Sequence, residues 1–112
     1  MLGTPGGSRI ITMVLHAILG VVAGESATDI VARPRWHHQY LPDEIQYERG
    51  AFDGATLARL TAMGHRLREV SPYGNMQVVI AERDSGAITG AADPRGEGRV
   101  MTSVPRPRQG HP

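Results

Sequence analysis

The sequence predicts an α+β fold in a single domain, with strands on one side of a helical layer. Hydrophobic periodicity gives the order helix, helix, strands, helix, strands, rather than the regular alternation of a parallel α/β protein. A length of 112 residues is enough for one modest core and too short to expect two. One Trp, three Tyr and one Phe are the only aromatic side chains available to fill that core.

The first predicted helix spans residues 8–23 and carries an unusually wide apolar surface. Two stripes at helical spacing form this surface: Ile10, Val14, Ile18 and Val22, and beside them Ile11, Leu15 and Leu19. Gly24 is placed to end the helix. Such a surface implies a helix covered on most sides, yet the few strands offer too little partner surface. We therefore expect something else to pack against this helix.

A second short helix and a hairpin are predicted next. Ser26, followed three residues later by Asp29, resembles a capping box, and Pro34 stops the helix. Residues 35–40 and 44–49 alternate in polarity, and the Leu-Pro-Asp turn between them favours an antiparallel pair.

The second half of the chain predicts one helix and three strands. Residues 53–63 form an amphipathic pattern that ends at a glycine, and residues 65–70 are predicted as a strand. Residues 76–81 and 87–92 are predicted to pair as an antiparallel hairpin around Asp-Ser-Gly.

The last residues have no periodic pattern. Residues 99–112 carry three prolines and little to bury, which predicts a disordered tail after a domain that covers residues 1–98.

Composition excludes several classes of function. A formal net charge of +1 gives no electrostatic case for nucleic acid or for an anionic membrane surface. The absence of cysteine rules out disulfides and thiolate chemistry. The apolar run at residues 10–23 is interrupted and shorter than the roughly 20 residues that a bilayer requires, so no membrane insertion is expected. No convincing signal peptide and no cofactor motif are found.

The glycine-rich stretch L-G-T-P-G-G-S-R at residues 2–9 is the strongest candidate site. Pro5 fixes its φ angle, and Gly6 and Gly7 can bring bare backbone N–H groups close to a ligand. At a helix N-terminus such donors favour an anion, or an oxygen that becomes one. The alternative is a tight turn with Ser8 as N-cap. A phosphate-binding P-loop is disfavoured because its lysine is missing.

Two further groups of residues could carry chemistry. His37 and His38, with Asp43 and Glu44 close behind, suggest metal ligands, but adjacent residues on a strand point to opposite faces. A structural or hydrogen-bonding pair is therefore favoured over a metal site. His16 lies in mid-helix and is interpreted as a satisfied core histidine.

The segment Asp93-Pro94-Arg95-Gly96 forms an Asx-type turn or lends its carboxylate and guanidinium to a partner, and the turn is favoured. No G-x-S-x-G motif and no Ser/His/Asp arrangement is present. By motif alone, this is an oxyanion loop without its nucleophile.

Three blocks in order and at matching spacing resemble the C-terminal part of the small subunit of γ-glutamyltransferases. They are L-G-T-P-G-G-S-R-I-I at residues 2–11, P-R-W-H-H-Q-Y-L-P-D at residues 34–43 and G-A-A-D-P-R-G at residues 90–96. The resemblance implies part of an N-terminal-nucleophile (Ntn) hydrolase αββα sandwich, with mostly antiparallel strands flanked by helices. It also implies a periplasmic, secreted or cell-surface protein.

The activity implied by this family is cleavage of the γ-glutamyl amide of glutathione and related compounds. A freed N-terminal Thr attacks the amide, and water or an amino acid or peptide acceptor resolves the acyl-enzyme. Carried onto this sequence, the family's oxyanion hole falls on the backbone N–H groups of Gly6 and Gly7, which are then both catalytic and substrate-binding. No cofactor and no metal is implied.

This sequence departs from the family pattern in one important respect. It contains no Thr-Thr-His motif, and Thr4 cannot replace that nucleophile because residues precede it. The family residues that hold the substrate's α-carboxylate and α-amine also have no counterpart. We therefore expect a fragment, a split copy or a relic that needs the upstream part of the small subunit and the large subunit as partners. The alternative is a non-catalytic module that docks through residues 10–22.

Overall fold

The computed structural model describes residues 1–103. Of the predicted tail, residues 99–103 contain no helix or strand, and residues 104–112 lie outside the described residues. The domain boundary near residue 98 therefore stays a prediction.

The helices and strands follow one another largely in the order that the sequence predicts. The helices are α1 (Ile10–Val22), α2 (Ala27–Ala32), α3 (Gly54–Ala62) and the short 3-10 helix η1 (Gly7–Arg9). The strands are β1 (Leu2–Gly3), β2 (Trp36–His37), β3 (Ile45–Glu48), β4 (Leu67–Val70), β5 (Gln77–Ala81) and β6 (Ile88–Ala92).

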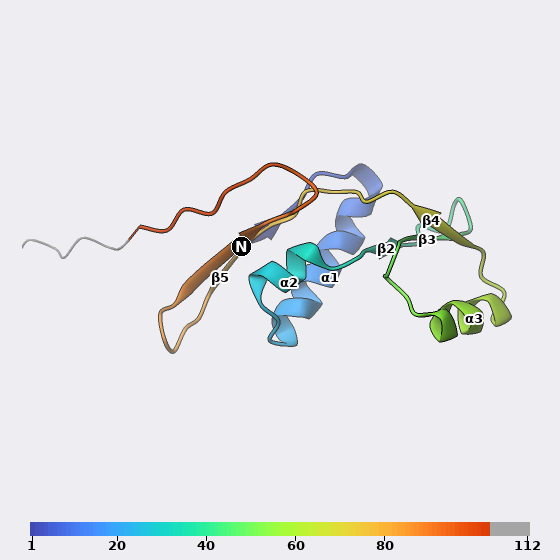
Figure 1. The fold of residues 1–112 in the computed structure, drawn as a ribbon, viewed down its shortest axis with the longest axis horizontal. Coiled ribbons are helices and arrows are strands. Elements are labelled where there is room, and N and C mark those ends of the chain that lie inside the picture. Colours follow the sequence, from blue (N-terminus) through green and yellow to red (C-terminus); the bar gives the residue numbers. More distant parts are fainter. Residues whose placement is uncertain (104–112) are drawn as a thin grey trace, which may run out of the picture.

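The strands form two three-stranded sheets, in the orders β1-β5-β6 and β2-β3-β4. Figure 1 shows the sheets toward opposite ends of the described chain, with α1 and α2 between them and α3 beside β4. The pairs β1–β5, β5–β6 and β2–β3 are antiparallel. The predicted α+β class and both predicted hairpins are confirmed.

Two features of the sheets were not predicted. Leu2 and Gly3 form β1 on β5, although two residues are too few to show a strand pattern. Strand β4 pairs with β3 in parallel, because α3 carries the chain across from one strand to the next.

The predicted helix ends are largely confirmed. The Ser26 hydroxyl accepts a hydrogen bond from the amide of Asp29, as in a capping box, and Asp53 caps α3 through its carboxylate. Gly24 and Gly64 follow their helices with positive φ. The alternative that Ser8 caps the first helix is wrong: α1 has Arg9 at its N-cap, without a side-chain cap.

Helix α1 packs against the core of the chain through only a narrow face. Met13, Ala17 and Gly20 are buried, and this face belongs to neither predicted stripe. A Cβ on Gly20 would lie 2.8 Å from a side-chain carbon of Ile30 in α2, so small residues allow α2 to approach closely. The core continues into the first sheet through Val31, Met76, Val78 and Ala91.

A second, wide face of α1 is left largely uncovered by the described residues. We define its apolar face as Ile11, Leu15, Ile18, Leu19 and Val22, which are 79%, 51%, 46%, 54% and 79% exposed. The expected shortage of partner surface is therefore present. Among the described residues, no helix has the length and hydropathy that crossing a bilayer would require.

Candidate functional site

Residues 4–7, which we call the glycine loop, connect β1 to η1 and α1. Gly6 has φ 152° and Gly7 has φ 58°, a region that favours glycine. Both residues are exposed. Among the hydrogen bonds of the described residues, neither amide N–H is a donor. Both amides are therefore available to a ligand, just ahead of a helix N-terminus.

Glycine is required at position 6 for space as well as for conformation. A Cβ there would lie 2.5 Å from the terminal methyl of Met13, a fully buried core residue. At Gly7 a Cβ would meet nothing within 4 Å, so only its backbone conformation restricts it. The loop thus rests on the core at Gly6 and is open at Gly7.

The P-R-W-H-H-Q block lies next to the beginning of α1. The Ser8 hydroxyl donates to the side-chain oxygen of Gln39 at 2.8 Å, and His37 Nε2 contacts the same oxygen at 2.9 Å. Because this oxygen can only accept, Nε2 of His37 carries a proton. Nδ1 of His37 lies 2.7 Å from the Thr12 hydroxyl and accepts from it when the ring is neutral.

The two adjacent histidines point to different surroundings. His37 is buried, whereas His38 is partly exposed and contacts the carboxylate of Asp43 at 3.2 Å. The prediction of a structural, hydrogen-bonding pair is confirmed. In residues 1–103, no three His, Cys, Asp or Glu side chains are grouped as metal ligands.

His16 differs from its prediction as a satisfied core histidine. It is half-buried, and its ring packs against Trp36 with a centroid distance of 4.7 Å and the two ring planes tilted by 45°. Burial, followed by the nearby Arg33, lowers its pKa from the usual value of 6.5. Its environment is therefore aromatic packing at the junction of α1 and β2.

The segment Asp93-Pro94-Arg95-Gly96 forms the predicted Asx-type turn. The amide of Arg95 donates to the Asp93 carboxylate at 2.9 Å, and the amide of Gly96 donates to the Asp93 carbonyl at 3.2 Å. The carboxylate and guanidinium that the alternative reserved for a partner are used within the chain instead.

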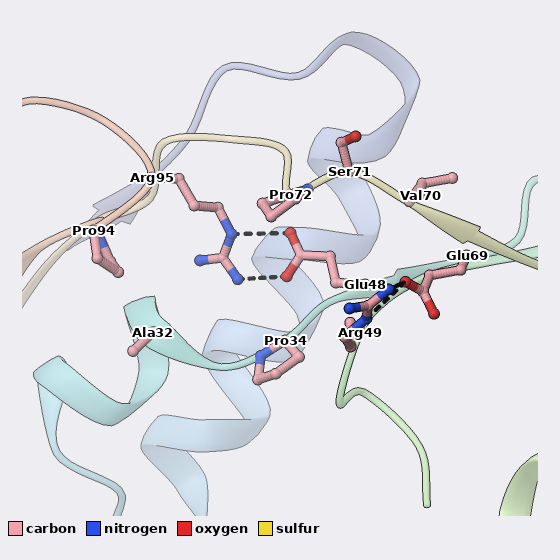
Figure 2. A pocket seen from close by; sticks show the side chains of 10 residues that line it. All are labelled: Ala32, Pro34, Glu48, Arg49, Glu69, Val70, Ser71, Pro72, Pro94 and Arg95. Atoms are coloured by element: carbon pink, nitrogen blue, oxygen red, sulfur yellow. Dashed lines mark hydrogen bonds and ion pairs between the residues drawn. The ribbon is translucent and has the colours of Figure 1, made fainter. Parts of the chain in front are cut away.

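Four charged side chains that meet between the two sheets form what we call the charged joint: Arg35, Glu48, Asp93 and Arg95. Arg35 pairs with Asp93 at 2.5 Å. Arg95 binds both oxygens of Glu48, at 2.9 and 2.5 Å, and Figure 2 shows this second pair. Arg35, Glu48 and Asp93 are 5%, 3% and 1% exposed. Sequence reasoning did not find the contributions of Arg35 and Glu48, because their partners lie 58 and 47 residues away.

The joint keeps its carboxylates ionised. Burial opposes the charge of Asp93, but the amides of Arg95 and Met76 and then the guanidinium of Arg35 hold its pKa below the usual value. The pKa of Glu48 is also lowered, because Arg95 and the amide of Tyr73 outweigh its burial. A carboxylate held in this way is a poor general acid.

A cavity of about 700 Å³ opens beside the joint. Figure 2 shows the Arg95–Glu48 pair on one wall and the Arg49–Glu69 pair on another, with Pro34 and Pro72 nearby. Every charged side chain lining this cavity is paired with another. The carboxylates and guanidiniums of the cavity are therefore occupied by each other, and the glycine loop, with two undonated amides, stays the stronger candidate.

Comparison with known proteins identifies the family. The profile of the family described as Gamma-glutamyltranspeptidase matches residues 1–103. The glutathione hydrolase proenzyme of Escherichia coli is 40% identical over 94 residues, which are 83% of this chain and 16% of that protein. The chain thus spans less than a fifth of that relative.

Solved structures give the same result. A γ-glutamyltranspeptidase of Pseudomonas nitroreducens superposes with a TM-score of 0.81 at 37% identity, over 93% of this chain and 55% of that one. For the Helicobacter pylori enzyme the values are 0.74 and 35%, over 85% of this chain and 53% of that one. The fold is therefore part of an Ntn hydrolase, as expected. The chain belongs to the γ-glutamyltranspeptidase family.

Proposed function

We propose that this chain supplies the oxyanion hole of a γ-glutamyltransferase. The substrate is the γ-glutamyl amide of glutathione or a related compound, and the reaction proceeds through a Thr acyl-enzyme. Water, or an amino acid or peptide acceptor, then takes the γ-glutamyl group. The observation that carries the proposal is the pair of exposed, undonated amides at Gly6 and Gly7, placed directly before a helix.

The chemistry follows from these two donors. When a hydroxyl attacks the amide carbon, the carbonyl oxygen becomes negative, and two aimed N–H groups stabilise it more than they stabilise the neutral substrate. The positive end of α1 lies on the same side and favours the same charge.

The attacking hydroxyl is proposed to come from a polypeptide that corresponds to the part of the relatives that this chain does not match. Thr4 is unsuited to attack, because its hydroxyl already donates to the Pro5 carbonyl and accepts from the amide of Asn75. By the same reasoning, the partners are the remainder of the small subunit and the large subunit, in a periplasmic, secreted or cell-surface enzyme.

The second candidate function is a non-catalytic module or relic that docks through α1. The exposure of its apolar face favours this reading as well. A neighbouring reading frame that encodes a Thr-Thr-His motif would favour the enzyme over the module.

Turnover of a γ-glutamyl anilide tests the proposal. We expect no turnover by the 112 residues alone, and turnover when they are mixed with a polypeptide that supplies the relatives' remaining length, including the Thr-Thr-His motif. In the mixture, Gly6→Ala should lower kcat by up to about 10²- to 10³-fold, the usual effect of losing one oxyanion donor. Alanine keeps the N–H, but its Cβ would clash with Met13 and disfavour φ 152°, which turns the N–H away from the oxyanion.

Gly3→Ala is the matched control. A Cβ at Gly3 meets nothing within 4 Å, and its φ is not positive, so activity should be retained. Full activity of the unmixed chain, or of the Gly6→Ala mixture, would contradict the proposal.

A further inference from the structure

Thr4, two residues before Gly6, connects the glycine loop to the segment around Asn75. Thr4 is partly buried at the beginning of the glycine loop. Its hydroxyl donates to the carbonyl oxygen of Pro5 at 2.8 Å and accepts from the backbone amide of Asn75 at 3.0 Å. Because the Asn75 N–H approaches the hydroxyl oxygen, the hydroxyl proton is left for Pro5.

Peptide geometry transmits this contact to Gly6. The Pro5–Gly6 bond is trans, so its C=O and N–H point in opposite directions within the peptide plane. A hydroxyl that holds the Pro5 oxygen on the side of Thr4 therefore leaves the Gly6 N–H on the opposite side. The next peptide is fixed in the same way, because the amide of Arg9 donates to the Gly6 carbonyl at 3.2 Å and leaves the Gly7 N–H on the opposite side.

The Asn75 amide is itself held by the charged joint. On one side of it, the amide of Tyr73 donates to Glu48 at 2.9 Å, and the carbonyl of Tyr73 accepts from Arg35 at 2.5 Å. On the other side, the amide of Met76 donates to Asp93 at 2.8 Å. Both flanks of the donor are thus attached to buried charges.

Gly74 makes this contact a close one. A Cβ on Gly74 would lie 2.6 Å from the sulfur of Met13, 3.0 Å from Arg35 and 3.3 Å from the Thr4 hydroxyl. Any larger residue at position 74 would separate the Asn75 amide from Thr4. The path from the joint to the glycine loop is therefore continuous and tightly packed.

We propose that Thr4 is a positioning residue, whose hydroxyl turns the Pro5–Gly6 peptide so that the Gly6 N–H faces the ligand, and that the charged joint fixes this hydroxyl through Asn75. The effect of Thr4 on catalysis rests on the proposed function, but the orientation of the Gly6 N–H can be measured on this chain alone.

The test compares Thr4→Val, Thr4→Ala and Thr4→Ser in the full chain by ¹H–¹⁵N correlation spectra. Val keeps the shape and removes the hydroxyl, Ala removes it without adding bulk, and Ser retains it. We expect Val and Ala to shift the Gly6 amide signal more than that of Gly7, and Ser to leave both near their wild-type positions. Thr61→Val is the matched control, since Thr61 donates only within α3.

The outcomes separate this proposal from the proposed function. Wild-type Gly6 signals in both Val and Ala, or a shift in Ser as large as in Val, would overturn the positioning role. A shifted Gly6 signal in Thr4→Val with unchanged kcat in the reassembled enzyme would leave Thr4 as the residue that orients Gly6 and would refute the oxyanion role. With both proposals correct, kcat falls about fivefold to tenfold, KM changes little, and Ser restores the rate.

Discussion

The charged joint buries charged side chains, whereas the apolar face of α1 exposes apolar ones. Both regions depart from the usual distribution, in opposite ways. The joint buries Arg35, Glu48 and Asp93, each below 9% exposed, whereas Leu15 and Leu19 on α1 are more than half exposed. Every charge of the joint has its partner within the described chain. The face of α1 has none there. The charged region thus has all its interaction partners within the described chain, while the apolar region needs a partner from outside it.

The difference has a physical cause. A charge can be buried when an opposite charge and backbone groups satisfy it locally, but its removal leaves the other charge unpaired. An apolar side chain has no such local solution and is stabilised only by contact with more apolar surface. Substitutions in the joint should therefore change the stability of the isolated chain, whereas substitutions on the apolar face should change its binding to a partner.

The largest effect is expected from Asp93→Asn. The change leaves the Arg35 guanidinium buried without its counter-charge, which should lower the free energy of unfolding by about 3–5 kcal/mol. Urea unfolding measures this value. Glu69→Gln is the control, because its pair with Arg49 is exposed and worth only about 0–1 kcal/mol. Equal losses of stability in both variants would contradict the claim that the buried pair contributes more than the exposed one.

A comparable but smaller loss is expected from Met13→Ala on the inner side of α1. Met13 is 2% exposed, so its truncation should cost about 2–5 kcal/mol. Leu19→Glu, on the outer side of the same helix, should change the stability of the isolated chain by no more than about 0.5 kcal/mol. If Leu19→Glu destabilised the chain as much as Met13→Ala, the outer face would belong to the core.

The smallest effect is expected from acid. The pKa values of Asp93 and Glu48 are lowered in the folded chain from 3.8 and 4.5. The stability that their ionised forms supply is therefore complete above these ordinary values and is lost as the pH falls through the lower, folded-state values. Urea unfolding at a series of pH values should show that Glu48→Gln loses less stability on acidification than the wild type. A steeper acid loss in this variant would contradict the sign.

The sequence predicted the local features better than the long-range ones. The cap at Ser26, the glycine that ends α3 and both hairpins depend on neighbouring residues, and the pattern contained them. The pairing of Arg35 with Asp93, and of β3 with β4, joins residues far apart in the chain, and no local pattern encodes it. For the site, family resemblance indicated Gly6 and Gly7, whereas the Thr4–Asn75 contact required coordinates.

The most direct test is whether this chain forms a complex with a polypeptide that corresponds to the part of the relatives it does not match. Sedimentation velocity should show a complex with the wild type and with Glu69→Gln. Leu19→Glu should weaken that complex by at least about tenfold, because burial of one leucine contributes about 1.5–3 kcal/mol. A complex that forms equally well with Leu19→Glu, or no complex at all, would contradict the inference that the apolar face of α1 needs a partner.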